Sequence, residues 1–292
     1  MRVVLNLMGR NLRLYFRDRL GVFFSLLSAL ILFLLYTLFL GSGQIDNLQS
    51  NFPAATEQQV KTFVDTWMFA GIVGITSITT GLGAMNVFVE DSASGRFRDF
   101  LVSPIRREKL ILGYLLSAGV IALIMTTVVL IISLAYLFLV DDVSFRPGEI
   151  ATVYGFLALS CVAFAALSAF VVSFVRTAGA YSALSTIVGT ILGFLAGAYI
   201  PVGALPDGVR TVINALPFMQ ASVPVRQEMT ADSLQAMAGS QPGAVDAMQE
   251  VYGITASVGD WAITNAYVLF ILAAMTVVFT LLAALRIRRR IA

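Results

Sequence analysis

The stretch ILGYLLSAGVIALIMTTVVLIISLAYLFLV, residues 111–140, contains no Asp, Glu, Lys or Arg. A helix of about 20 apolar residues is long enough to cross the hydrocarbon core of a bilayer. The surplus length of this stretch predicts a helix that tilts or protrudes. Five more stretches without these charges occur along the chain, at residues 20–40, 66–89, 151–175, 177–205 and 262–285. The sequence therefore predicts six transmembrane helices.

The composition supports the same fold class and excludes several functions. Apolar residues make up 58% of the 292 residues and charged residues 12%, against about half and about a quarter in soluble domains. Histidine is absent and Cys161 is the single cysteine, which excludes catalysis by histidine, a Cys cluster for a metal and a disulfide within the chain. A net charge of +2 indicates no nucleic-acid partner. We expect an all-α polytopic membrane protein, one domain over residues 1–292, with no catalytic residues and no cofactor of its own.

The charged residues are distributed unequally between the two sides of the predicted bundle. Six spans place both termini on one side, and that side carries fifteen of the 19 basic residues but only five of the 17 acidic ones. The opposite side holds Lys61, Arg146, Arg210 and Arg226. An excess of Lys and Arg marks the cytoplasmic side. The pattern predicts a multi-pass protein of the cell (plasma or inner) membrane with cytoplasmic termini.

Residues 1–19 carry a regular basic stripe. Arg2, Asn6, Arg10, Arg13 and Arg17 recur at helical spacing, and apolar residues fill most of the positions between them. Such a segment predicts an amphipathic helix at the cytoplasmic interface, with its apolar face in lipid and its arginines among the headgroups. It is either a plain anchor or a lever between a cytoplasmic partner and the first span.

The cytoplasmic loop EDSASGRFRDFLVSPIRREKL, residues 90–110, holds apolar side chains among charges. Ser94 is a reasonable N-cap for a short amphipathic helix over residues 95–102, and Pro104 then forces a turn. That helix would expose two phenylalanines and a leucine. These side chains either fit a groove on a partner protein or dip into the headgroup layer.

The fifth stretch ends in a segment rich in proline. Pro201 and Pro206 break an α-helix, Pro206-Asp207-Gly208 is typical of a turn, and a helix over residues 209–215 is too short to cross. Non-helical backbone at membrane depth must be covered by protein or line a cavity. We therefore expect an extracellular gate over residues 201–217, and re-entrant outer-leaflet helices and a cap within residues 206–261, before the last span.

The rest of the outer region, residues 219–261, contains four methionines. Short helices over residues 232–238 and 244–251 are expected to form a cap there. A methionine-rich exterior can handle soft metals, but the spacing is irregular and methionine commonly fills amphipathic helices. The methionines are Met219, Met229, Met237 and Met248.

The predicted spans contain no ionisable side chain other than tyrosine and cysteine. Ion-coupled carriers usually need a carboxylate or a cation within the membrane, so this class is disfavoured. Gly189, Gly193 and Gly197 form a stripe of small residues that permits close helix approach. The stripe serves packing within one subunit, a dimer seam or a groove that faces the substrate.

Two motifs and the six-span layout resemble the permease subunits of type-2 ABC exporters. The first motif is an acidic pair at residues 90–91, Gly95, a hydrophobic pair, Ser103-Pro104, basic residues and then LILGYLL at residues 110–116. The second is FLAGAYIPVGALP at residues 194–206, followed by VRTVINALPF at residues 209–218. In that family the first segment is the coupling helix that docks on the ATPase subunit. The second marks where the fifth span ends and the outer re-entrant helices begin.

The resemblance implies an ATP-driven exporter of a hydrophobic or amphipathic small molecule such as a drug, a lipid or a natural product. It implies alternating access by two permease copies, identical or different, with two ATPase subunits that hold the ATP and Mg. This chain has no GxxxxGK[ST] sequence, so it is not itself the ATPase. The alternative is a non-transporting membrane scaffold or sensor for a cytoplasmic partner. An intramembrane enzyme is disfavoured because no catalytic constellation lies near the spans.

The resemblance and the spacing together give four sets of candidate residues. For coupling to the ATPase they are Glu90, Asp91, Gly95, Arg96, Phe97, Arg98, Phe100, Leu101, Ser103, Pro104 and Arg106, with Arg10, Arg13 and Arg17 on the interfacial helix. For a substrate cavity between spans two and five they are Met68, Ile72, Ile75, Thr79, Leu184, Ile187 and Ile191. For the extracellular gate they are Tyr199, Pro201, Leu205, Pro206 and Pro217.

Overall fold

The structure, a computed structural model, describes residues 2–96 and 107–291, and this part of the chain is almost entirely helical. Within it, six helical segments are long and apolar enough to cross a membrane. They are Ala29–Asn51, Glu57–Ala93, Arg107–Asp141, Pro147–Val172, Ala178–Leu195 and Asn265–Ile287. The protein is therefore an all-α polytopic membrane protein, as its composition predicts.

The elements follow one another in a simple order. They are α1 (Arg2–Arg17), α2 (Arg19–Ser25), α3 (Leu27–Leu35), η1 (Tyr36–Leu40), α4 (Gly41–Asn51), α5 (Glu57–Ala84), α6 (Asn86–Ala93), α8 (Arg107–Asp141), α9 (Pro147–Val172), α10 (Ala178–Leu195), η2 (Val202–Ala204), α11 (Asp207–Ala215), α12 (Pro217–Ala238), α13 (Ala244–Val251), β1 (Ser257–Val258), β2 (Trp261–Ala262) and α14 (Asn265–Ile291). The two short strands pair antiparallel as a small hairpin before the last helix.

Helix α5 is the centre of the bundle, and most of its side chains are buried. It packs against α8, α9 and α12 and also contacts α3 and α4. Glycines permit two of its close approaches: a Cβ added at Gly71 would lie 3.0 Å from the Ala198 Cβ, and one at Gly81 would lie 3.1 Å from the Ala165 Cα. The core is thus built around the second span.

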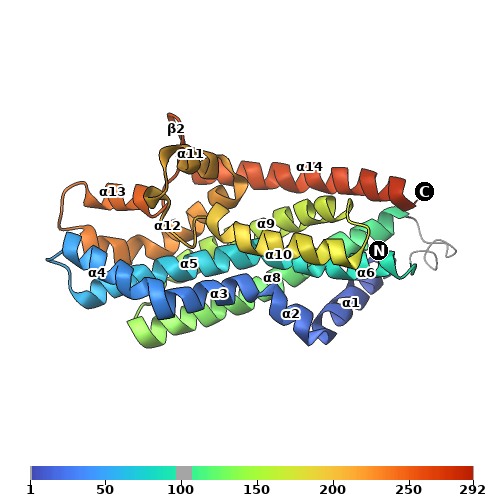
Figure 1. Cartoon of the computed structure of the whole chain (residues 1–292), viewed down its shortest axis with the longest axis horizontal. Coiled ribbons are helices and arrows are strands. Elements are labelled where there is room, and N and C mark those ends of the chain that lie inside the picture. Colours follow the sequence, from blue (N-terminus) through green and yellow to red (C-terminus); the bar gives the residue numbers. More distant parts are fainter. Residues whose placement is uncertain (1, 97–106, 292) are drawn as a thin grey trace.

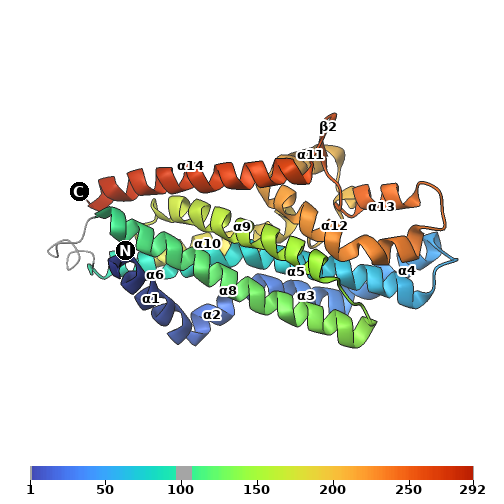
Figure 2. The same ribbon diagram turned by 180° about the vertical axis from the view of Figure 1, so that it is seen from behind.

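The two ends of the bundle differ in what they bring together (Figures 1 and 2). Helix α1, helix α6, the start of α8 and the end of α14 meet at one end, which we call the inner end. Helices α4 and α13 lie at the opposite, outer end. The N-terminal helix and the chain's last helical turns therefore share one end, as an even number of spans requires.

Helix α5 begins nine residues before the predicted span at residues 66–89. Thr56 and Gln59 form a capping box at its start. The first turns carry Lys61 and Asp65, and the Lys61 Nζ lies 2.7 Å from the Asp65 Oδ2. Lys61 also pairs with Asp141 at the end of α8. The limits of an uncharged stretch therefore fall short of the helix ends, because charges that pair with one another continue the helix.

The stretch predicted as a single span at residues 20–40 contains a break. Helix α2 ends at Ser25, α3 continues into the π-helical turn η1, and α4 extends the helix to Asn51. Tyr36 opens the π-turn and is buried, with its ring 5.7 Å from the Trp67 ring. The apolar helical segment thus runs over Ala29–Asn51, shifted toward the outer end.

The predicted span at residues 177–205 and the predicted outer cap both need correction. Helix α10 ends at Leu195, because Gly197 adopts a left-handed conformation and Pro201 follows. The expected short helix 232–238 is the end of α12, a helix of 22 residues that packs against α5, α9 and α14. Its buried polar side chains made it resemble a loop. Helix α13 is confirmed at Ala244–Val251, and α11 includes the predicted residues 209–215.

Candidate functional site

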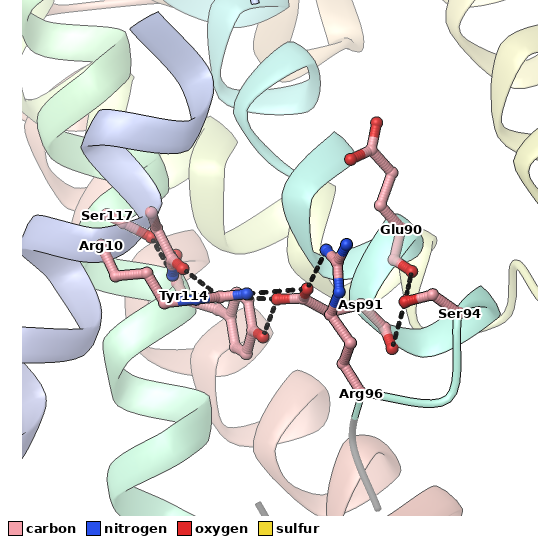
Figure 3. Close-up of polar contacts among 8 residues, drawn as sticks. Arg10, Glu90, Asp91, Ser94, Arg96, Tyr114 and Ser117 are labelled. Atoms are coloured by element: carbon pink, nitrogen blue, oxygen red, sulfur yellow. Dashed lines mark hydrogen bonds and ion pairs between the residues drawn. The ribbon is translucent and has the colours of Figure 1, made fainter. Parts of the chain in front are cut away.

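Asp91 is the centre of a polar junction at the inner end (Figure 3). Its carboxylate is fully buried and accepts two hydrogen bonds from Arg10, from Nη1 at 2.7 Å and from Nη2 at 2.9 Å. Tyr114 Oη donates to Asp91 Oδ2 at 2.6 Å, and Arg96 Nη1 donates to Oδ1 at 3.2 Å. One carboxylate therefore joins α1, α6, α8 and the chain that leads into residues 97–106. We call Arg10, Asp91, Arg96 and Tyr114 the inner junction.

Helix α1 is docked on the bundle by this junction and by an apolar stripe. Leu7, Asn11 and Tyr15 recur every four residues and are the buried side chains of α1. Asn11 Nδ2 donates to Ser117 Oγ on α8 at 3.1 Å, and its Oδ1 accepts from Arg10 Nη1 at 3.0 Å. Arg10 is therefore not a freely outward-facing arginine like the one that the stripe predicts, because its guanidinium is bound by the buried carboxylate of Asp91.

The other three arginines of the predicted stripe, Arg2, Arg13 and Arg17, are exposed. The hydrogen bonds and the charge of Asp91 raise the pKa of the Arg10 guanidinium, with burial acting in the opposite direction. Arg10 is thus a permanent cation bound in a bidentate manner, the strongest geometry for such a pair.

Ser94 is not the N-cap that the sequence predicts, and the predicted helix over residues 95–102 lies outside the described residues from position 97 on. Ser94 is the C-cap of α6, and its hydroxyl donates backward to the Glu90 carbonyl at 2.7 Å. Gly95 has a φ of +76° and ends the helix. Glu90 is exposed and accepts from Asn86 Nδ2 at 2.8 Å. Of the predicted coupling residues, Phe97, Arg98, Phe100, Leu101, Ser103, Pro104 and Arg106 lie outside the described residues.

A cleft of about 960 Å³ begins beside the inner junction and follows α10. Its walls come from the end of α1, from α2 and α3, and from α10, with α5 and α6 contributing as well. Glu90 and Arg96 line it together with Thr79, Ser185 and Thr190. Phe194 and Tyr199 line it farther toward the outer end, with their rings edge to face at 5.0 Å. The cleft is therefore polar and charged near the junction and aromatic toward the outer end.

The structure divides the predicted cavity residues into three groups. Thr79 lines the large cleft. Leu184, Ile187 and Ile191 line a separate apolar cavity of about 190 Å³ between α5, α9 and α10. The remaining three pack in the core and line neither space, which corrects the prediction that they face a substrate; they are Met68, Ile72 and Ile75.

The predicted gate residues follow the end of α10. Tyr199 and Pro201 are buried in the turn, and Leu205 is partly buried against the core. Pro206 is exposed before α11, and Pro217 opens α12. Tyr199 alone among the five lines the cleft.

Sequence reasoning missed the roles of Asn11, Tyr114 and Arg226. Asn11 could have been found as a polar residue inside the apolar stripe of α1. Tyr114 lies 23 residues after Asp91 in the sequence, and Arg226 was placed in an outer loop although it is fully buried. Their partners depend on helix packing, which no local pattern reveals.

In the part of the chain that the structure describes, no group of three or more Asp, Glu or Cys side chains is placed to hold an ion. Met219, Met229 and Met237 are buried core residues, which fits their interpretation as helix fillers.

Comparison with known protein families identifies one match over most of the chain. Residues 42–285 match the family described as ABC-2 family transporter protein. Comparison with curated proteins gives no significant match. The matched range begins within α4 and ends within α14, so it includes the cleft wall formed by α5, α6 and α10 as well as Asp91.

Proposed function

This chain belongs to the ABC-2 family of transporter proteins and is a membrane permease of an ABC transporter, and we propose that it exports an amphipathic small molecule. Such a permease works with an ABC ATPase subunit, which supplies ATP hydrolysis. The proposal adds that this subunit is a separate polypeptide that holds the ATP and Mg, and that two permease copies, identical or different, assemble around the export path.

The orientation that we propose places the inner end in the cytoplasm. Helix α1, the described residues on either side of residues 97–106 and the end of α14 share that end (Figure 1). These segments hold most of the basic residues, and basic residues are retained on the cytoplasmic side of cell membranes.

The observation that carries the proposal is the bidentate pair between Arg10 and Asp91. Asp91 lies six residues before the proposed docking segment, and the same carboxylate binds α1 and α8. A displacement of that segment by an ATPase would therefore move α1, α6 and α8 together. Packed junctions of this kind transmit rigid-body motion rather than absorb it. In this account α1 is a lever and Asp91 is a positioning residue.

The cleft is the proposed path of the cargo. Charged residues lie at its inner mouth, serines and threonines lie along α10, and aromatic rings close the outer part. An amphipathic molecule can place its polar group among the charged and polar residues and its apolar part against the aromatic rings. Exposed apolar side chains on the same helix, including Ile187 and Ile191, would be covered by the second permease copy or by membrane lipid.

The proposal is tested by asking what binds the predicted docking segment. We expect that the tagged chain, solubilised gently from native membranes, co-purifies with a small ATPase that has a Walker motif. Replacing Phe97 and Leu101 by alanine should release the ATPase. The matched control is the pair Phe138→Ala and Leu139→Ala, because these side chains are exposed at the far end of α8. Mass spectrometry of the eluate is the measurement.

Two results would contradict the proposal. If no ATPase is recovered after crosslinking, the scaffold or sensor function takes its place. If the ATPase is recovered equally with the Phe97 and Leu101 variant, docking occurs elsewhere on the inner end.

A further inference from the structure

Arg226 on α12 is a charged side chain with no exposure to solvent. Burial lowers the pKa of its guanidinium to about 10, so the group stays positive at neutral pH. Among the described residues its partners are main-chain carbonyls, a thioether and an aromatic ring rather than a carboxylate. A buried charge is costly unless it is well bonded, so these partners must matter to the fold or to the function.

The first partners are the two main-chain carbonyls that directly follow the end of α10. This helix ends in a Schellman motif: Gly197 N donates to the Phe194 carbonyl and Ala198 N donates to the Gly193 carbonyl, both at 2.9 Å. The carbonyls of Ala196 and Gly197 remain without helix partners. Arg226 Nη2 donates to both, at 2.7 and 2.8 Å. The cation therefore completes the helix end where the helix dipole also favours positive charge.

The second group of partners ties this helix end to the outer segments. Arg226 Nη1 donates to the Gly253 carbonyl at 3.2 Å, in the segment between α13 and β1. The guanidinium carbon lies 5.6 Å from the centre of the Trp67 ring on α5, within reach of a cation–π interaction. Trp67 Nε1 in turn donates to the Tyr252 carbonyl at 2.7 Å. Arg226 thus holds α10, α12 and the α13–β1 segment against the central helix.

The backbone around the guanidinium leaves room for it and for little else. Gly197 and Gly253 both have a φ of +62°. A Cβ added at Gly253 would lie 2.9 Å from Arg226 Nη1, and one added at Gly197 would lie 2.7 Å from a Val202 methyl carbon. Two left-handed glycines therefore surround the charged group.

The turn that Arg226 completes carries the aromatic end of the cleft. Tyr199 N donates to the Gly193 carbonyl at 3.2 Å, and the Tyr199 carbonyl accepts from Tyr36 Oη at 3.4 Å. Tyr199 and Phe194 line the cleft from either side of this turn. The position of the Tyr199 ring is therefore set by a helix end whose two free carbonyls are bound by one guanidinium.

We propose that Arg226 is a positioning residue of the outer gate, which holds the α10 turn so that Phe194 and Tyr199 close the outer end of the cleft. The inference rests on the proposed function, because it takes the cleft as the export path. It assigns a gating role to a residue that touches no cargo.

The test measures access to the cleft from outside the cell. Thr190→Cys places a thiol in the cleft one helical turn before Phe194. The native Cys161 is buried and gives little background. With Arg226 intact we expect slow labelling by a membrane-impermeant maleimide added to whole cells that express the complete transporter. Arg226→Gln removes the charge and most of the donors, and labelling should rise at least about tenfold.

Two further variants separate gating from folding. Arg226→Lys keeps the positive charge but loses the planar guanidinium with its several N–H donors. The labelling rate should therefore lie between those of the wild type and Arg226→Gln. Arg210→Gln removes a surface cation of α11 that pairs with Asp207 at 3.0 Å, and labelling should match wild type. If Arg226→Gln is too unstable to reach the surface, the Arg226→Lys comparison decides.

A folded Arg226 variant that labels at the wild-type rate would overturn the gating role and leave Arg226 as a structural anchor. Recovery of the ATPase from the same membranes is scored separately. Loss of the ATPase from the wild type would refute the proposed function, whereas unchanged labelling would refute only the gate.

Discussion

Asp91→Asn is expected to release α1 from the inner end and to speed amide hydrogen exchange in α1 roughly 30- to 150-fold. The amide keeps one acceptor oxygen but presents an NH₂ group to a site where three side chains donate. Arg10 is then left without its bidentate partner. Removing one partner of such a pair costs about 2–3 kcal/mol when the other side chain is partly exposed, as Arg10 is.

Hydrogen–deuterium exchange of the purified complex measures this effect residue range by residue range. Glu90→Gln is the matched control, since it makes the same chemical change on an adjacent, exposed carboxylate. In the Glu90→Gln variant the amides of α1 should exchange at the wild-type rate. Equal exchange in wild type and Asp91→Asn would show that α1 is held by its apolar stripe alone, and the lever would lose its basis.

Gly193→Ala is expected to displace the gate tyrosine. A Cβ at this position would overlap the Tyr199 ring, which lies directly over the glycine. The ring cannot stay, and forced rearrangement in a packed site costs about 1–3 kcal/mol. We expect open access at the outer end of the cleft, seen as faster external labelling of Thr190→Cys, and reduced thermal stability.

Gly155→Ala in α9 provides the control for this substitution, because a Cβ there meets no atom within 4 Å. Its stability should stay within about 1 kcal/mol of wild type, the difference in helix propensity between glycine and alanine. If Gly193→Ala labels and melts like Gly155→Ala, Tyr199 does not close the cleft. Two of the three glycines in the predicted stripe, Gly193 and Gly197, make close contacts within the subunit. Packing within one subunit is one of the three uses that the sequence left open for the stripe.

The fold was largely predictable from the sequence because lipid as a solvent imposes a strong rule. Charges are excluded from the middle of a span, so the six apolar stretches were visible without any structure. Helix α13 and the short helix α11 were also predicted, since glycine and proline limit them clearly. Errors fell at helix ends, where Lys61 continues α5 by pairing with Asp65 and with Asp141 on α8. They also fell at α12, a helix of 22 residues that was expected only over residues 232–238.

The site was less predictable, because its polar groups are satisfied by distant partners. Asp91 was predicted as a docking charge of the proposed coupling segment, whereas its burial makes it an internal connector. Arg226 was counted as an outer-loop cation because α12 carries charged residues, and only stretches without charges were taken as spans. Thr66 and Ser233, whose hydroxyls lie 2.8 Å apart, show how the bundle satisfies such residues. Only the packing of α5 against α12 creates these partners.

The central claim is that ATP hydrolysis acts through the inner junction to open the cleft at its outer end. The most direct measurement is external labelling of Thr190→Cys in vesicles that contain the complete transporter, with ATP and vanadate supplied at the inner side. The account predicts faster labelling after trapping in the wild type and no change in Asp91→Asn, with the ATPase still bound. Labelling of the wild type that does not depend on nucleotide would contradict it.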